Sequence, residues 1–222
     1  MKRIVFLTAI VAAAISVSLT VTSALAASGG SPASGWHIGY YTPSAYGTLS
    51  NKQAASVAGG VASLDFTSRS DTALLVTGQK AQNPTLLGDL TGKSITATFT
   101  ISGATGAFTY YGEPDACGTP ASVRLFFETS NAGGFDFTHY WWSNPASAVL
   151  ANGTWTVTAA VAPAEWSDWN GQTGTTVPAG FAAAASNVTT IGLSFGGGCF
   201  FENGVGTTDG SGSFVLDSYT AS

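Results

Sequence analysis

Apolar and polar side chains alternate with a period of two residues in two long segments of the chain. In residues 94–101, positions 95, 97, 99 and 101 are apolar, and serine or threonine occupies the positions between them. In residues 154–161, Trp155 and Val157 begin a second apolar series that alternates with threonine. Because successive side chains of a strand point to opposite faces, each segment predicts a strand with one buried face and one hydroxyl-rich face.

Other segments combine β-branched and aromatic residues between turn residues, which predicts further strands at 61–67, 73–78, 121–129, 135–142, 188–195 and 213–220. The Asn152-Gly153 pair is of a type favoured in tight hairpins. Only residues 181–185 suggest a helical turn, and so short a segment cannot hold a helix alone. We therefore predict an all-β fold, an antiparallel two-sheet β-sandwich in a single domain.

The start of the chain has the three parts of a secretory signal peptide. Residues 1–3 are basic after the methionine, residues 4–22 are apolar, and Ala24-Leu25-Ala26 fits the small-residue motif that precedes cleavage. A retained membrane anchor is the alternative, since the apolar stretch approaches the ~20 residues that span a bilayer. We predict residues 1–26 as a signal peptide and residues 27–222 as a secreted, extracellular domain with no membrane contact after cleavage.

Composition excludes several classes of protein. The 222 residues are 45% hydrophobic and only 9% charged, so the chain can bury a large core and is not intrinsically disordered. Seven Lys and Arg stand against twelve Asp and Glu, a formal net charge of −5. Loss of Lys2 and Arg3 with the signal peptide would leave five basic side chains and a charge of −7. A nucleic-acid binder needs basic surface, so we predict no nucleic-acid partner. We also expect a monomer.

Cys117 and Cys199 are the two cysteines of the chain. Outside the cytoplasm they permit one disulfide, and closing a loop of about 80 residues would stabilise the fold by roughly 4.5 kcal/mol on the chain-entropy model. A cysteine nucleophile or metal site would need a nearby histidine or a CxxC spacing, and neither cysteine has one. We predict a Cys117–Cys199 disulfide and no metal ligand.

The two predicted strands at 121–129 and 135–142 are separated by residues 130–134, a plausible hairpin loop. If these strands pair, one face presents charged and aromatic side chains together: Arg124, Phe126, Glu128, Asp136, Thr138, Tyr140 and Trp142. Such a face suits a sugar, because the C–H face of a pyranose lies flat on an aromatic ring while its hydroxyls need donors and acceptors. In the alternative interpretation, Arg124 pairs with a carboxylate on an exposed face and the aromatic rings cover the edges of the core.

A second aromatic group follows the predicted strand at 154–161. Trp166 and Trp169 lie three residues apart beside Glu165 and Asp168, after Pro163 has ended that strand. They either form a platform at the edge of the sugar-binding face or fold back over the mouth of the sandwich. Residues 110–115, on the other side of Cys117, form a comparable aromatic and acidic loop.

The second half of the chain resembles galactose-binding-like jelly rolls. The resemblance rests on residues 150–157, Trp166, residues 181–195 and residues 212–219. This half of the chain is similar to secreted bacterial carbohydrate-binding modules and to the laminin type IV domain. This resemblance implies a jelly roll that binds ligands on its concave sheet or at its loops. It also implies that Asp217 stands where such modules hold a structural calcium; because residues 28–63 offer no evident acidic partner, we commit to no cofactor.

Two other functions remain open. A jelly-roll glycoside hydrolase would use a pair of carboxyl groups, for which Glu128 and Glu202 are the best candidates because both have apolar neighbours. A Ser-His-Asp site is disfavoured, since the chain has only His37 and His139 and no Gly-x-Ser-x-Gly motif. A surface or matrix module that contacts only other proteins is the third possibility.

We favour a secreted, non-catalytic domain that binds a neutral polysaccharide. The basic residues after residue 26 are scattered along the chain, so an acidic glycan would meet a repulsive field; they are Lys52, Arg69, Lys80, Lys93 and Arg124. The predicted ligand-binding residues are Arg124, Glu128, Asp136, Tyr140, Trp142, Trp166 and Trp169.

Overall fold

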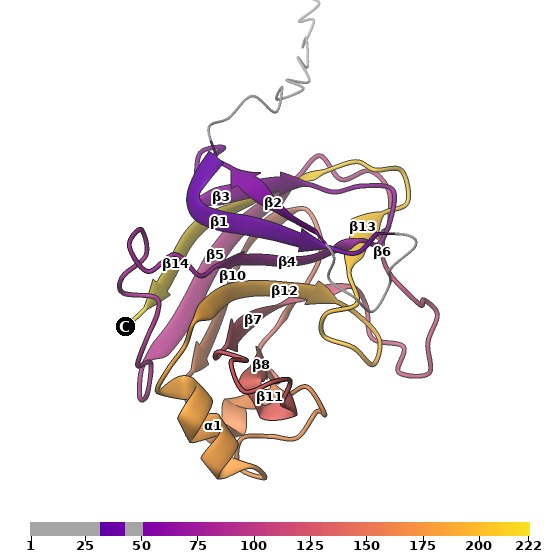
Figure 1. Cartoon of the computed structure of the whole chain (residues 1–222). Coiled ribbons are helices and arrows are strands. Elements are labelled where there is room, and N and C mark those ends of the chain that lie inside the picture. The colour runs from indigo at the N-terminus through magenta and orange to yellow at the C-terminus, as the bar shows by residue number, and fades with distance from the viewer. Residues whose placement is uncertain (1–31, 43–50) are drawn as a thin grey trace, which may run out of the picture.

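The computed structural model describes residues 32–42 and 51–222 (Figure 1). The predicted signal peptide and its cleavage point lie outside these residues. Within them the fold is all-β and antiparallel, as predicted, with one short α-helix. The strands are β1 (Pro32–Tyr40), β2 (Asn51–Ser56), β3 (Ala62–Asp65), β4 (Thr72–Thr77), β5 (Ser94–Ser102), β6 (Phe108–Tyr110), β7 (Ser122–Glu128), β8 (Tyr140–Ser143), β9 (Ala148–Val149), β10 (Gly153–Ala160), β11 (Trp166–Asp168), β12 (Thr190–Gly196), β13 (Val205–Thr207) and β14 (Ser213–Ala221).

The described strands belong to one hydrogen-bonded sheet in the order β10-β5-β14-β3-β2-β1-β4-β12-β7-β8-β11. Strands β6, β9 and β13 pair with it off this path. Figure 1 shows the sheet curled upon itself rather than lying flat. Two separate sheets, as a sandwich would have, are not confirmed, because the pairing of Ser56 with Ser63 joins β2 to β3 and makes the path continuous.

The main hydrophobic core lies inside the curl. The ring of Phe195 on β12 packs edge-on against Phe214 on β14, with centroids 5.3 Å apart, and Phe214 stacks on Phe99 of β5 at 4.8 Å. The predicted alternation explains this core, since Ile95, Ala97, Phe99 and Ile101 of β5 are all buried. On the opposite face of β5 and β10, threonine hydroxyls hydrogen-bond across the strands in the pairs 96–158, 98–156 and 100–154.

A second, smaller apolar cluster covers the opposite face of the sheet. It consists of Tyr41, Ala73, Leu74, Val76, Phe126 and Trp142. The alternation along single strands separates it from the main core, because Leu125 and Phe127 of β7 belong to the main core and Phe126 between them belongs to this cluster. These strands are therefore covered by apolar side chains on both faces.

One predicted strand is shorter than expected. Of residues 135–142, only the last three belong to β8, and residues 137–139 form a 3₁₀ helix instead. Asp136 is the residue that causes this turn, since its carboxylate accepts hydrogen bonds from the backbone N–H and the hydroxyl of Thr138.

The predicted Asn152-Gly153 hairpin is also wrong, because β9 pairs with β7 and the Asn152 amide instead bonds the backbone of Ala104.

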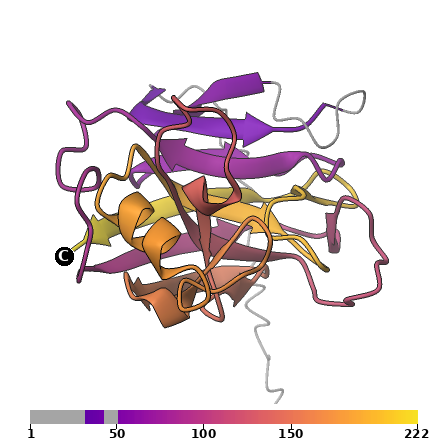
Figure 2. The same cartoon turned by 60° about the horizontal axis from the view of Figure 1, so that its bottom comes forward.

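The helix α1 (Pro178–Ala185) lies beside β8 and β11, at the bottom of Figure 1 and in the foreground of Figure 2. It is longer than the predicted turn, because Pro178 occupies the first helical position, where a missing N–H costs nothing. Packing holds it: Phe181, Ala184 and Ala185 are buried, and the Phe181 ring meets Trp141 edge-on at 5.0 Å. None of the helices in the described ranges has the length and apolar character required to cross a bilayer.

Candidate functional site

The register of β7 and β8 brings several predicted site residues to one face of the sheet. Phe126 pairs with Trp142, and Glu128 pairs with Tyr140. The predicted common face of these strands is therefore confirmed for β7 and for the β8 residues. It is the face that carries the second apolar cluster, so its side chains point away from the main core.

Two adjoining chambers open on this face. The narrow chamber, of about 310 Å³, is lined by Tyr41, Leu74, Val76, Phe126, Glu128, Asn131, Phe135, Tyr140, Trp169, Thr190 and Glu202. The wide chamber, of about 620 Å³, is lined by Tyr41, Tyr111, Phe137, Trp142, Asp168, Trp169, Asn170, Gly171, Cys199, Phe200, Phe201, Glu202 and Asn203. Because Tyr41, Trp169 and Glu202 line both chambers, we treat them as one aromatic pocket.

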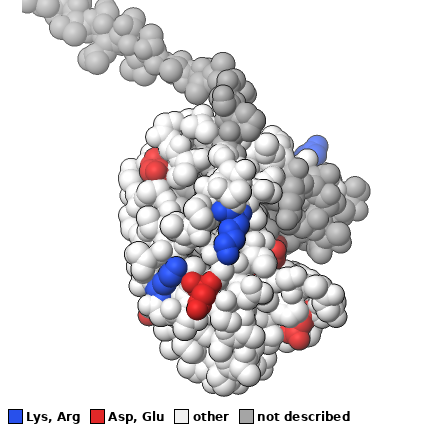
Figure 3. All heavy atoms as spheres, turned by 60° about the vertical axis from the view of Figure 1, so that its left-hand side comes forward, with Lys and Arg blue, Asp and Glu red and all other residues white. Residues whose placement is uncertain are grey.

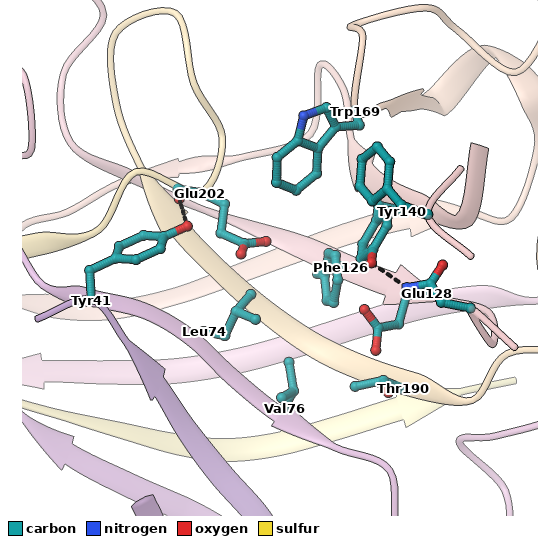
Figure 4. A pocket seen from close by; sticks show the side chains of 11 residues that line it. Tyr41, Leu74, Val76, Phe126, Glu128, Tyr140, Trp169, Thr190 and Glu202 are labelled. Carbon is teal, nitrogen blue, oxygen red and sulfur yellow. Dashed lines mark hydrogen bonds between the residues drawn. The ribbon is translucent and has the colours of Figure 1, made fainter. Parts of the chain in front are cut away.

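Figure 4 shows how the narrow chamber is built. Tyr41 and Glu202 lie on one side, Tyr140 and Glu128 lie on the other, and Leu74 and Val76 of β4 lie below them. Both carboxylates extend into the chamber (Figure 4). The chamber thus combines an apolar floor with polar groups on opposite walls, the usual character of a small-molecule site.

Trp169 is the most exposed ring among the predicted site residues, with 46% of its surface accessible. Its indole contacts three other rings edge-on, those of Tyr140 at 5.4 Å, Trp142 at 5.6 Å and Phe135 at 5.8 Å between centroids. These contacts hold the side chain in place while leaving part of its face open. An aromatic surface that is both exposed and fixed can stack against a ligand at a small cost in conformational entropy.

The loop that carries Glu202 is fixed to the rest of the protein by several bonds. The predicted Cys117–Cys199 disulfide is present, with Cα atoms 5.1 Å apart. Asp115 accepts a 2.8 Å hydrogen bond from the Cys199 backbone N–H. The Tyr41 hydroxyl donates a 2.9 Å bond to the Glu202 carbonyl. The disulfide therefore supports one wall of the pocket in addition to cross-linking the chain.

Two tyrosine hydroxyls in the pocket lie in an environment that disfavours their ionised form. Burial, and then the nearby charges of Glu128 and Glu202, raise the pKa of Tyr140. Burial, followed by the charge of Glu202, raises the pKa of Tyr41 as well. Both phenols therefore remain protonated at physiological pH and can donate hydrogen bonds.

Arg124 supports the wall instead of facing the ligand. Its guanidinium lies 4.1 Å from the centre of the Phe201 ring and donates a 2.7 Å bond to the Ser143 carbonyl. Burial lowers the pKa of this group. Arg124 lines neither chamber, so its predicted direct contact with a ligand is not supported, and it instead holds Phe201 in place.

The other predicted site residues divide into three groups. Glu128, Tyr140 and Trp169 line the pocket; Trp142 lines the wide chamber too, although only 3% of it is exposed. Trp166 is fully buried in the main core, and its indole N–H donates to the Ala160 carbonyl, so its predicted position at the edge of the face is wrong. Asp136 lines neither chamber, because its carboxylate caps the 3₁₀ helix.

Several pocket residues were not predicted, because they lie in loops rather than on alternating strands. Tyr41 follows β1, Asn131 and Phe135 lie in the loop between β7 and β8, and Phe200 and Phe201 lie beside Cys199. The sequence did offer a signal for Phe200 and Phe201, because a disulfide at Cys199 holds its neighbours in place. Nothing local in the sequence marked Tyr41 as a pocket residue.

The carboxylate of Asp217, where the resemblance implied a calcium site, bonds within the protein. Asp217 is exposed, and its carboxylate accepts a hydrogen bond from Thr100. The acidic and cysteine group that does come together in the described ranges is Asp115, Cys117 and Cys199, and its sulfurs form the disulfide. A disulfide sulfur is not the thiolate that binds metals, so this group has one carboxylate to offer.

Comparison of the chain with protein-family models, with curated proteins and with solved structures finds no match, so the pocket itself is the basis for assigning a function.

Proposed function

We propose that the protein is a secreted carbohydrate-binding domain that holds a saccharide chain in the aromatic pocket without converting it. The observation that carries the proposal is the pairing of a fixed, half-exposed indole at Trp169 with polar groups on the walls below it. Stacking on the indole would take the apolar face of a sugar ring. The two carboxylates, the two phenols and the amides of Asn131 and Asn203 offer partners for its hydroxyls.

The shape and the charge of the pocket support this class of ligand. Its two chambers adjoin and share a wall, which suits consecutive units of a chain better than one compact molecule. Glu128, Glu202 and Asp168 line it, so anionic glycans would be repelled, whereas neutral and cationic saccharides would not. Charged side chains are sparse on the face of the molecule seen in Figure 3, in keeping with a weakly charged exterior.

Calorimetric titration with soluble oligosaccharides of several linkages tests the proposal. At least one should bind, and Trp169→Ala should weaken that binding by about tenfold or more, because a ring that anchors a ligand can contribute roughly 2 kcal/mol. Trp155→Ala is the matched control, since Trp155 is partly buried but lines neither chamber. If no saccharide binds, or if both variants bind equally well, the proposal fails.

A second candidate function, glycoside hydrolysis, is favoured by one specific observation. Glu128 and Glu202 both line the narrow chamber, and the charges of both raise the pKa of Tyr140. Glycosidases of most families use two carboxyl groups on either side of the bond that is cleaved. The arrangement therefore has the two groups that such a reaction requires.

Turnover separates the two functions. Incubation with the saccharides that bind should release no new reducing ends if the domain only binds. If reducing ends do appear, and if Glu128→Gln and Glu202→Gln abolish them while binding persists, the protein is a hydrolase. Absence of both binding and turnover would instead favour a module that contacts other proteins.

A further inference from the structure

The aromatic pocket has an uneven distribution of charge. Three carboxylates line it, those of Glu128, Glu202 and Asp168, and no Lys or Arg is among the described residues that line either chamber. Arg124 lies behind the wall, where it packs against Phe201 and bonds the Ser143 carbonyl. The negative charge of the pocket is thus concentrated on a surface that is otherwise aromatic.

Asp168 provides an independent observation, because one oxygen of its own carboxylate is buried without a donor in the described part of the chain. The residue is only 1% exposed, and its Oδ1 accepts bonds from the backbone N–H groups of Asn170 and Gln172. Its Oδ2 is buried and has no hydrogen-bond partner among the described residues. A buried carboxylate oxygen without a donor is costly, and in native proteins such a group calls for an explanation. A positive charge in the wide chamber, which Asp168 lines, would offset this cost.

The aromatic rings favour the same kind of ligand. A cation is attracted to the face of an indole, phenol or phenyl ring, and Trp is the strongest of these. The pocket presents the exposed part of Trp169 together with Tyr140, Phe137 and Phe200, the last of which is 65% exposed. Rings and carboxylates in one pocket thus both attract a cation, whereas a neutral sugar gains no charge attraction from either.

We infer that the pocket selects saccharides that carry protonated amino groups, that is, chains of deacetylated amino sugars. This inference rests on the proposed function, because it names the class of saccharide that the same pocket holds. Each ammonium group of such a chain has three donors for carboxylate oxygens and a charge that the rings attract. The acetylated form of the same sugar has neither feature at that position.

Three hexasaccharides with the same β-1,4 linkage isolate the amino group. They are the hexamers of glucosamine, of N-acetylglucosamine and of glucose, which carry an ammonium, an acetamide and a hydroxyl group at the same carbon. Titrations are run at about pH 5.5, which lies above the usual pKa of Glu, about 4.3, and below that of an α-amino group, about 7.7. The glucosamine hexamer should bind at least about tenfold more tightly than the other two at low salt. Because surface charge is screened by salt, this preference should shrink as the ionic strength rises from about 0.01 M to about 1 M.

Charge variants test whether the pocket causes the preference. Asp168→Asn keeps the Oδ1 acceptor and removes the charge, and Glu202→Gln does the same on the opposite wall. Each should reduce the preference for the glucosamine hexamer over the glucose hexamer by about threefold or more. Asp217→Asn is the matched control, since it changes the net charge equally at an exposed site that lines neither chamber.

The outcomes separate this inference from the proposed function. If the three hexamers bind equally, or if the preference survives in both pocket variants, the selection of amino sugars is overturned and carbohydrate binding stands. If the glucosamine hexamer fails to bind while another saccharide binds, the inference alone is again overturned. If no saccharide binds at all, both are overturned. A preference that is lost in the pocket variants and retained in Asp217→Asn supports both.

Discussion

The indole N–H of Trp142 donates a 3.0 Å hydrogen bond to the hydroxyl of Ser194, although the two residues lie on strands that are not neighbours. Trp142 belongs to β8 and Ser194 to β12, and β7 lies between these strands in the sheet. Ser194 then donates a 2.8 Å bond to the Phe201 carbonyl. One tryptophan therefore ties together two strands and the loop that forms a wall of the pocket.

Replacement of Trp142 should destabilise the fold rather than affect only ligand binding. Trp142→Ala removes a side chain that is only 3% exposed, so we expect a loss of about 3 to 5 kcal/mol in the free energy of unfolding. Trp155→Ala should cost less, because Trp155 is only partly buried at the margin of the main core. Denaturant unfolding of the two variants measures the difference. A larger loss for Trp155→Ala would contradict this ranking.

Gly192 should tolerate no side chain. A Cβ at this position would lie 2.2 Å from the Leu75 carbonyl oxygen and 2.7 Å from the Cα atom of Val76, both in the neighbouring strand β4. Because backbone cannot yield cheaply, Gly192→Ala should cost more than about 2 kcal/mol. Gly133→Ala is the control, since nothing lies within 4 Å of its Cβ, and it should change stability by less than about 0.5 kcal/mol. Similar melting temperatures for the two variants would argue against the close approach of β12 and β4.

The charged form of Asp209 should stabilise the fold at neutral and mildly acidic pH, and this contribution should be lost in strong acid. Its carboxylate accepts hydrogen bonds from Thr105 and Ser211, which lower its pKa to about 2. Because the folded pKa lies below the unfolded value of about 3.9, the contribution is complete above that value and is lost as the pH falls towards 2. Asp209→Asn should therefore lower the melting temperature at about pH 6 and have little effect at about pH 2. An equal effect at both pH values would show that the charge of Asp209 is not responsible.

Reduction of the Cys117–Cys199 disulfide should weaken both the fold and the pocket. The chain-entropy model gives a loss of roughly 4.5 kcal/mol for a loop of this size. Cys199 also lines the wide chamber, so the affinity for a bound saccharide should fall together with the melting temperature. Both are measured with and without reductant. A double variant with serine at both positions should no longer respond to reductant, and a thiol that reacts in the native, unreduced protein would rule out the disulfide.

Period-two alternation predicted the strands of this fold well. The expected strands at 94–101 and 154–161 correspond to β5 and β10, and the segments at 121–129 and 188–195 correspond to β7 and β12. The pattern is strong there because one face of each strand packs against a core. It could not predict how the strands join into one sheet, because β2 and β3 meet through a single residue pair.

The pocket was predicted only where it depends on neighbouring strands. Glu128 and Tyr140 were placed on a common face because alternation along β7 and β8 determines it. Trp166 was misplaced because its segment alternates too briefly to distinguish the buried face from the exposed one: all three residues of β11 are buried. Contacts between distant loops, such as that of Tyr41 with Glu202, depend on the tertiary fold and leave no local pattern.

The position of β14 determines when the chain can fold. β14 lies between β5 and β3 in the sheet, although it comes after all the other described strands in the sequence. Until β14 has been synthesised, β5 lacks a strand on one side of its ladder, and the main core lacks Phe214 and Leu216. The sheet therefore cannot form strand by strand from the N-terminus as the chain is synthesised. Pairings between residues so distant in the sequence also make folding slow.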